Sequence, residues 1–367
     1  MIETRTRAII IVLAMMVVVV PVYGQQTAEQ LYYKGMAFYY QGDYDEAIRA
    51  FDEIIGGNPS IASAWNGKGL SLVGLAKFDE AIQAYDEAIR LDPTLAYVYY
   101  NKGLAVGMQG KLNESLVYFD EAIRLDPTFM NAWISKGKAL GMLYKLNESL
   151  ICLDEAIRLD PEFAEAWNSK GVILYLQGKY DEAIKAYDEA IRIDPKFALP
   201  LNNKGEALCM QGKYDEALVC FDEAIRLDPE SDMAWYRKGN ALYLQGKYDE
   251  AIQAYDEATR LYPGYAMAWN NKGYALYNQG KYTEAIECID EAIKLDPEYV
   301  NAWDSKGDVL AIQGKYDEAI QAYDEAIRLN PEYAVAWHQK GLALEALGKA
   351  SEANDAYAKA RELGWTG

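Results

Sequence analysis

One 34-residue unit, repeated ten times without insertion or deletion, fills residues 28–367 of this sequence. A Lys-Gly pair stands at the seventh and eighth positions of every unit, from Lys34-Gly35 in the first to Lys340-Gly341 in the tenth. A fixed period of this size indicates that each unit is one supersecondary element whose apolar face is buried against its neighbours. The sequence therefore predicts a stack of similar elements instead of two or three globular domains.

The fifth unit, residues 164–197, shows what each element is. Its first half has Trp167 and Gly171 at helical spacing, and Gly178 then interrupts the pattern. Apolar residues of the second half recur at i, i+3, i+4 and i+7, which marks one face of an amphipathic helix. That helix should end before Pro195, because the residue that precedes a proline is pushed out of the α region. Each unit is therefore predicted to form two antiparallel helices joined by a tight turn.

These residues resemble the tetratricopeptide repeat family, and the resemblance covers residues 28–367. The small residues of that family stand at positions 8, 20 and 27 of the fifth unit as Gly171, Ala183 and Ala190. Trp occupies position 4 in seven units, and Pro occupies position 32 in nine. The resemblance implies an all-α fold, a right-handed superhelical solenoid of antiparallel helix pairs whose first helices line a concave groove. The predicted units are residues 28–61, 62–95, 96–129, 130–163, 164–197, 198–231, 232–265, 266–299, 300–333 and 334–367.

Position 7 departs from the family pattern, since an apolar Leu is usual there and all ten units carry Lys. The aliphatic stem of a lysine can cover apolar surface while its ammonium group stays near water. We therefore expect these lysines to cover the seam between units and to pair with carboxylates of the second helices.

The first and last units differ from the others on their outward faces. Asn354 and Arg361 replace apolar residues in the tenth unit, and Gln30 does so in the first. Thr27 followed by Gln30 also matches a capping box at the start of a helix. Because polar outer faces on terminal units keep a solenoid soluble, we expect a complete array with no attached catalytic domain.

The four cysteines are not spaced as a disulfide framework. Cys152, Cys220 and Cys288 share position 23 in units that are two apart, which is farther than a disulfide can bridge. We interpret these three and Cys209 as small buried side chains.

The N-terminal segment precedes the repeats and has a different composition. Arg5 and Arg7 are followed by an apolar run over residues 8–22 and then by small residues, the order found in a secretory signal. We interpret residues 1–24 as a signal peptide or an uncleaved N-terminal anchor, with residues 25–27 as a short lead-in. Both alternatives predict an extracytoplasmic protein, secreted or anchored, whose membrane contact is limited to residues 8–22 if the segment is uncleaved.

Composition and charge restrict the chemistry of the repeats. The chain carries 56 acidic and 36 basic residues, so it is a poor partner for nucleic acid, whose binding depends on neutralising phosphates with Lys and Arg. It has a single histidine, His338, which we place at the surface, and no phosphate-binding glycine loop or Cys-x-x-Cys pair. We therefore expect no catalytic residues, no metal site and no cofactor, and we predict that the protein is not an enzyme.

Two Asn-Glu-Ser sequons start at Asn113 and Asn147, both at position 18 of their units. In an exported protein these asparagines are candidates for N-glycosylation. The alternative is that they are drift within the repeat, since Asn is also a good helix cap.

By resemblance, positions 2, 5, 9, 12 and 13 of each unit face the groove, and they vary far more than the packing positions. Tyr offers rigid, amphipathic contact area there, and Asn can pair with the backbone of an extended peptide. The candidate partner-binding residues are Tyr32, Tyr39, Tyr40, Asn66, Tyr97, Tyr100, Asn168, Tyr175, Asn202, Tyr236, Tyr243, Asn270, Tyr274 and Tyr277.

Asparagines at position 6 and charges in the groove add to this pattern. Asn101, Asn203 and Asn271 partly resemble the asparagine ladder of glycosyltransferase-associated repeats of the same family. The family's chaperone-binding carboxylate clamp needs Lys at position 5, which no unit has, so a C-terminal carboxylate ligand is not expected. Lys138 is the single base against the acidic groove residues Glu29, Glu165, Glu206, Asp304, Asp308 and Glu345.

These observations favour a non-catalytic, exported protein–protein interaction scaffold. Its partner would be another protein that offers an extended, neutral-to-basic segment to the groove. A glycan-binding envelope protein is an alternative, because tyrosine rings beside carboxylates also suit sugars. A purely architectural cell-envelope protein is a further alternative, in which the tyrosines only pack between units.

Overall fold

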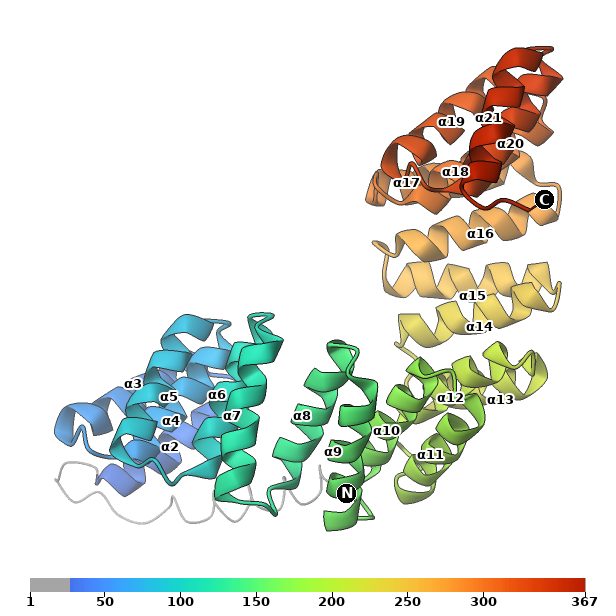
Figure 1. The fold of residues 1–367 in the computed structure, drawn as a ribbon. Coiled ribbons are helices and arrows are strands. Elements are labelled where there is room, and N and C mark those ends of the chain that lie inside the picture. The colour runs from blue at the N-terminus through green and yellow to red at the C-terminus, as the bar shows by residue number, and fades with distance from the viewer. Residues whose placement is uncertain (1–26, 367) are drawn as a thin grey trace. The chain divides into compact units, whose positions relative to one another are not determined.

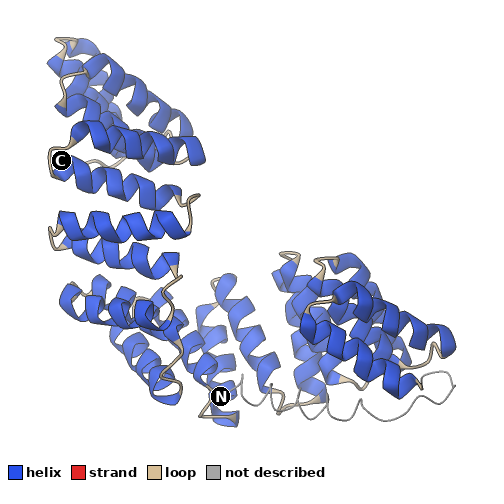
Figure 2. Ribbon diagram, turned by 180° about the vertical axis from the view of Figure 1, so that it is seen from behind, coloured by secondary structure: helices blue, strands red, loops and turns tan. Residues whose placement is uncertain are grey.

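The computed structural model describes residues 27–366, and all regular secondary structure in that range is helical (Figure 1 and Figure 2). Twenty helices fall two to each 34-residue unit, which confirms the all-α fold and the predicted helix pairs. The segment interpreted as a signal peptide or anchor, residues 1–24, lies outside the described residues. None of the helices in residues 27–366 has the length and apolar character that crossing a bilayer requires.

The chain divides into two parts, Met1–Tyr144 and Lys145–Gly367. The helices of the first part are α2 (Ala28–Gln41), α3 (Tyr44–Gly57), α4 (Ala62–Gly74), α5 (Phe78–Leu91), α6 (Ala96–Met108), α7 (Leu112–Leu125) and α8 (Met130–Met142). Those of the second part are α9 (Leu146–Leu159), α10 (Ala164–Leu176), α11 (Tyr180–Ile193), α12 (Ala198–Met210), α13 (Tyr214–Leu227), α14 (Asp232–Leu244), α15 (Tyr248–Leu261), α16 (Ala266–Asn278), α17 (Tyr282–Leu295), α18 (Val300–Ile312), α19 (Tyr316–Leu329), α20 (Ala334–Ala346) and α21 (Ala350–Glu362).

The turn between the two helices of a unit depends on one residue in the left-handed backbone region. In the fifth unit, Gly178 has a φ of 74° and reverses the chain between α10 and α11. Glycine adopts this conformation without the steric cost that a β-carbon brings. Eight units have glycine at this position, whereas Ala76 and Tyr144 adopt φ values of 57° and 56° in the second and fourth units.

A tight seam between the two helices of a unit, where both lie in the same part, explains the glycine at position 8. A β-carbon added to Gly171 would lie 2.4 Å from Cε1 of Tyr187, whose side chain is 1% exposed. Gly239 stands in the same relation to Tyr255, at 2.5 Å. The buried ring fills the space that the missing side chain leaves, so the seam is close-packed.

Ion pairs between successive units confirm the role expected for the lysine at position 7. Lys204 Nζ lies 2.6 Å from Oδ1 of Asp188 on the second helix of the preceding unit. Burial lowers the pKa of Lys204, but the hydrogen bond and charge of Asp188 outweigh it and the net shift is upward. The equivalent lysines of the second to tenth units all form this pair.

The tryptophan at position 4 strengthens the same interface. Trp167 Nε1 donates a 2.9 Å hydrogen bond to the carbonyl of Pro161 in the preceding unit. The ammonium group of Lys170 lies 5.5 Å from the centroid of the indole ring, within the range of a cation–π interaction. The positions of the repeat that hardly vary between units are therefore the positions that pack one unit against the next.

Within each part, the first helices of successive units form a layer. In the second part, α10, α12, α14, α16 and α18 each contact the next first helix along the chain. Successive second helices make no such contact within the described residues of either part. A stack that is tighter on one layer curves toward it, so the first helices line the concave face of each part.

The smaller expectations have mixed outcomes. Thr27 and Gln30 form the predicted capping box, with each side chain bonded to the backbone of the other. No disulfide joins the four cysteines, all of which lie in the described residues, and the three at position 23 are buried, whereas Cys209 in the groove is only half-buried. His338 is partly exposed, and its ring stacks on Trp365 at 4.8 Å between centroids.

Candidate functional site

The candidate tyrosines of the first part lie on α2 and α6 and pack partly within their own units. Tyr32 meets the buried Phe51 edge-on, with ring centroids 5.8 Å apart. Tyr100 lies 5.0 Å from Phe129. Tyr40 is the most open of the group, at 66% exposed. The five are Tyr32, Tyr39, Tyr40, Tyr97 and Tyr100.

The asparagines of positions 5 and 6 form hydrogen bonds from one unit to the next. Asn101 Nδ2 donates to Oδ1 of Asn66 at 2.9 Å, and Asn203 donates to Asn168 in the same way at 3.1 Å. Both acceptors are only 5% exposed. These candidate residues therefore make structural hydrogen bonds at the base of the groove.

In the second part, five candidate residues gather on α14 and α16. The rings of Tyr274 and Tyr277 stack with centroids 5.4 Å apart, and Tyr243 lies 6.1 Å from Tyr274. Asn278 donates a 3.1 Å hydrogen bond to the Tyr243 hydroxyl. The five are Tyr236, Tyr243, Asn270, Tyr274 and Tyr277.

The groove is hollowed beside this cluster by about 280 Å³. Asn240 holds the floor of the hollow in place, because its Oδ1 accepts hydrogen bonds from the Tyr255 hydroxyl at 2.8 Å and from Asn271 Nδ2 at 3.0 Å. The hollow is lined by Asn240, Tyr243, Leu244, Tyr255, Asn271 and Tyr274.

Three side chains at position 5 each keep one buried oxygen without a hydrogen-bond donor. Asn202, Asn270 and Asp304 are 4%, 5% and 9% exposed, and Oδ1 of each has no donor within the described residues. Buried polar groups are nearly always paired, because an unpaired one costs about 1–3 kcal/mol. The groove floor therefore contains three acceptor oxygens that no donor of the described residues satisfies.

A charged cluster lies in the groove of the sixth and seventh units. Glu206 on α12 forms an ion pair with the guanidinium group of Arg237 on α14. Arg237 also donates a 3.2 Å hydrogen bond to Asn203 Oδ1, and the Tyr175 hydroxyl donates to Glu206 at 3.3 Å. The acidic residue at this point of the groove is thus neutralised within the chain.

A second acidic cluster lies two helix pairs further on, at Asp304 and Asp308 of α18. The Tyr333 hydroxyl donates to Asp304 Oδ2 at 3.2 Å, and the Tyr323 hydroxyl donates to Asp308 Oδ1 at 2.9 Å. Burial, and then the negative charge of Asp308, raise the pKa of Asp304 to about 7. Burial also raises the pKa of Asp308. Both carboxylates are poorly hydrated for charged groups.

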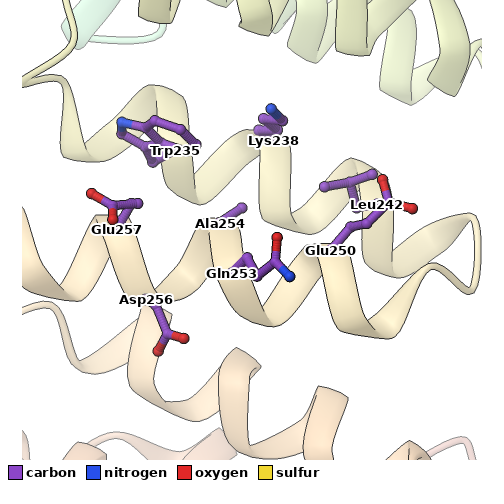
Figure 3. Close-up of a pocket in the computed structure, with 8 residues that line it drawn as sticks. All are labelled: Trp235, Lys238, Leu242, Glu250, Gln253, Ala254, Asp256 and Glu257. Carbon is purple, nitrogen blue, oxygen red and sulfur yellow. The ribbon is translucent and has the colours of Figure 1, made fainter.

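A larger hollow, about 450 Å³, lies between α14 and α15 and is drawn in Figure 3. None of its lining residues occupies a groove position of the repeat. Lys238 and Trp235 are engaged there in the packing of the repeat, with Asp222 and with the carbonyl of Pro229. We assign this hollow to repeat packing, and not to the candidate site.

The two sequon asparagines are exposed at the start of their helices. Ser115 and Ser149, the third residues of the sequons, are fully buried. Asn147 Oδ1 accepts a 3.0 Å hydrogen bond from Gln177 of the next unit, as Asp181 does from Gln211 at 2.9 Å. Asn147 therefore fills the structural place that Asp takes in other units, while glycosylation of Asn113 and Asn147 stays a prediction.

Sequence reasoning missed several residues that complete these clusters. Arg237 and Gln339 stand at position 6, where only asparagine was noted, and Arg237 corrects the view of a groove with Lys138 as its single base. Tyr323 and Tyr333 come from a second helix and from the loop before α20, outside the groove positions. A count of charge at position 6 would have found Arg237. No cluster of three or more His, Cys, Asp or Glu suited to a metal occurs in residues 27–366.

Family comparisons place repeats along the chain. The family description "Tetratricopeptide repeat" matches residues 32–96, 270–334 and 307–367. The description "Cilia and flagella-associated protein 70 C-terminal domain", a tetratricopeptide repeat domain, matches residues 73–266. No curated protein matches the sequence.

One of three similar solved structures shares the fold. A chain of the crystal structure of the APC/C hetero-tetramer Cut9-Hcn1 is similar over 82% of this chain and 59% of its own length, with 20% identity and a TM-score of 0.58. This chain therefore spans about three fifths of that relative. MamA (27% identity, TM-score 0.40) is similar over 43% of this chain and 93% of its own. YrrB, titled a TPR protein with an unusual peptide-binding site, has 25% identity and a TM-score of 0.42 over 51% of this chain and 97% of its own.

Proposed function

This chain belongs to the tetratricopeptide repeat family, and we propose that it is a non-catalytic, exported scaffold that holds an extended segment of another protein in its groove. The solenoid of helix pairs is a scaffold of the kind that supports protein–protein interaction. The segment is neutral to basic. Residues 145–367 contain the part of the groove that we assign to it.

The observation that carries this proposal is the open aromatic hollow formed by α14, α15 and α16, together with two donor-free oxygens at position 5. Oδ1 of Asn202 and Asn270 lacks a donor, and both residues stand at the same groove position, two units apart. An extended backbone offers N–H groups at regular intervals, and these can meet such acceptors. The tyrosines of α14 and α16 supply contact area that is rigid and amphipathic. A peptide can both donate to these acceptors and pack on the tyrosines, which favours a peptide-binding role over a purely architectural one.

The charge of the groove supports a neutral-to-basic segment. When they are ionised, Asp304 and Asp308 carry negative charge that no cation of the described residues neutralises. The whole chain has a formal net charge of −20. A surface of this sign attracts basic partners and repels acidic ones.

Export is proposed from the N-terminal sequence alone. Arg5 and Arg7 precede the apolar residues 8–22, an arrangement typical of secretory signals. Expression in the native host followed by N-terminal sequencing tests this proposal. A mature chain that starts at Gln25 supports a cleaved signal, an uncut chain in the membrane fraction supports an anchor, and a cytoplasmic uncut chain contradicts export.

The groove is tested by selecting peptides from a random extended library on the repeats and measuring their affinities by fluorescence anisotropy. Leu244, 56% exposed, lines the hollow, and Val219, 70% exposed, lies on the second helix α13. Leu244→Ser should weaken binding about tenfold, since it removes one apolar contact from the hollow. Val219→Ser is the matched control and should leave affinity unchanged.

Equal affinities for the two variants would contradict groove binding. Failure to enrich any peptide would contradict the proposed ligand class, and binding to an oligosaccharide array that Leu244→Ser abolishes would favour the glycan alternative. Tyr243→Ala extends the series to an aromatic residue of the same hollow.

A further inference from the structure

An acidic pair in the groove of the ninth unit has no cationic partner. Asp304 and Asp308 lie one turn apart on α18, and no Lys, Arg or His of residues 27–366 compensates either charge. Asp304 is 9% exposed, and its Oδ1 lacks a hydrogen-bond donor. A carboxylate withdrawn from water in this way is costly to keep ionised unless an opposite charge meets it.

The sixth unit contains a related arrangement with its cation in place. Glu206 stands at position 9 of that unit, as Asp308 does in the ninth. Arg237, 31 residues after Glu206, forms an ion pair with it. Gln339, 31 residues after Asp308, donates a 3.3 Å hydrogen bond to Asp308 instead. In the sixth unit, therefore, a guanidinium group fits beside the carboxylate of position 9. In the ninth unit, the carboxylate of position 9 has no guanidinium group of the described residues beside it.

Aromatic rings flank both arrangements. Tyr175 bonds to Glu206, and Tyr277 occupies the corresponding position 12 before Asp308. Burial and then the charge of Asp308 raise the pKa of Tyr277, which indicates that the two groups lie near one another. Tyr274 stacks on Tyr277 with centroids 5.4 Å apart. Rings beside a carboxylate suit a guanidinium group, which can stack on an aromatic face while it donates hydrogen bonds.

We propose that Asp304 and Asp308 bind the guanidinium group of an arginine in the bound segment, which supplies the positive charge that Arg237 supplies to Glu206. This inference rests on the proposed function and names the side chain that the segment must offer. Arginine is preferred to lysine because its planar fork of donors can meet two carboxylates together.

The other titratable groups around Asp304 and Asp308 are tyrosines or groups that already have a partner. The two carboxylates are therefore the groups expected to respond to the ligand. Tyr274 and Tyr277 face it from α16, Tyr323 from α19, and Tyr333 from the loop before α20. The aspartates of α17 and α19 that meet the next first helices, Asp290 and Asp324, are paired with Lys306 and Lys340. His338 of α20 stacks on Trp365.

The test is a carbon-13 NMR titration of the aspartate carboxyl groups of the full repeat array, with Asp304 assigned by its loss in Asp304→Asn. We expect a midpoint near pH 7 for Asp304, because burial raises its pKa to about 7. N-acetyl-argininamide should lower that midpoint by about one pH unit or more, since a nearby cation favours the ionised carboxylate. The matched neutral probe, N-acetyl-citrullinamide, should leave it unchanged.

Gln339→Arg tests the site without any added ligand, because it reproduces the Arg237 arrangement. The variant should lower the Asp304 midpoint by about one to three pH units and abolish the response to N-acetyl-argininamide. Arg237→Gln, at the other cluster, is the control and should leave the Asp304 midpoint unchanged. A midpoint that does not move in Gln339→Arg, or that moves equally with N-acetyl-citrullinamide or N-acetyl-lysinamide, would overturn the assignment.

These results are separable from the failure of the proposed function. If N-acetyl-argininamide shifts the midpoint while the peptide library gives no binders, the arginine site stands and the extended segment does not. If peptides bind the hollow while the midpoint ignores the probe, the groove function stands and the arginine site is refuted.

Discussion

The seam between the helices of a unit and the floor of its groove are both removed from water, yet they differ in what they leave unsatisfied. In the fifth unit, Gly171 meets a ring of Tyr187 that is 1% exposed, and the contact is wholly apolar on the glycine side. On the floor, Asn270 and Asp304 are similarly buried but keep an acceptor without a donor. The seam repeats almost unchanged along the chain, while the floor changes from unit to unit.

The difference has a thermodynamic meaning. A packed seam lowers the free energy of the folded chain, so one good solution serves every unit. An unpaired acceptor raises that free energy by about 1–3 kcal/mol, and a donor from outside the folded chain can compensate this cost. Ligand binding is such a compensation, and it is why the floor, and not the seam, carries the proposed function. Substitutions in the two regions should therefore change stability in opposite directions.

Gly171→Ala should give the largest effect, a loss of about 3 kcal/mol in the free energy of unfolding. The new β-carbon would lie 2.4 Å from Tyr187 Cε1, and overpacking of this kind costs about 1–3 kcal/mol. Urea denaturation followed by circular dichroism measures it. Gly56→Ala is the matched control, since nothing lies within 4 Å of its added β-carbon on α3, and it should be neutral or stabilising by up to about 1 kcal/mol. Equal losses for both variants would show that the seam is not tightly packed.

Asp304→Asn should have the opposite sign and stabilise the ligand-free chain by about 2 kcal/mol at pH 8. The folded-state pKa is raised to about 7, above an unfolded value of about 3.9. The folded state therefore binds more protons between pH 4 and 7, and this group lowers stability as pH rises through that window. A pKa that is raised by about three units in the folded state corresponds to about 4 kcal/mol of lost stability. Asp308 is half-buried, so water screens its charge and the expected loss is smaller than this value.

Thermal denaturation from pH 4 to pH 8 measures this effect. The stability gain of Asp304→Asn over the parent should grow with pH and level off above pH 7. Asp290→Asn, at a carboxylate already paired with Lys306 at 2.7 Å, is the control and should not gain stability at high pH. A gain from Asp304→Asn that is independent of pH would separate the effect from the titration of this carboxyl.

Ala76→Gly should give the smallest effect, a gain of about 0.5–1 kcal/mol. Ala76 adopts a φ of 57° at a turn where eight units use glycine, and a β-carbon is unfavourable in this conformation. Gly212→Ala is the reverse substitution at the equivalent turn, where φ is 74° and no atom lies within 4 Å. Its loss should mirror the gain at Ala76 in the same urea experiment. If both substitutions changed the free energy of unfolding in the same direction, backbone conformation would not determine which residue is preferred at this turn.

Much of the fold was accessible from the sequence because its determinants are local and periodic. Gly178 and Pro195 marked the turn and the end of the second helix, and α11 ends at Ile193 with Asp194 as its cap. The lysine at position 7 was predicted to pair with a second-helix carboxylate, and Lys204 bonds to Asp188. Because the sequence is periodic, an inference that holds for one unit also holds for the others.

The candidate site was accessible only in part. Tyr243 and Tyr274 were found from their columns, and they do share one hollow. Gln339 and Tyr333 were missed, because their roles depend on which side chains of successive units meet. Sequence spacing does not report whether a buried acceptor finds a donor.

By itself, the sequence determined the period, the helix pairs, the turns and the apolar seam, because each follows from backbone preference and from burial repeated every 34 residues. Only the tertiary structure decided which polar side chains of the groove satisfy one another. Arg237 reaches Glu206, whereas Gln339 leaves Asp304 and Asp308 without a cation. Such pairing depends on distances between units and on the low polarizability of a buried site, where an uncompensated charge is felt far more strongly than in water.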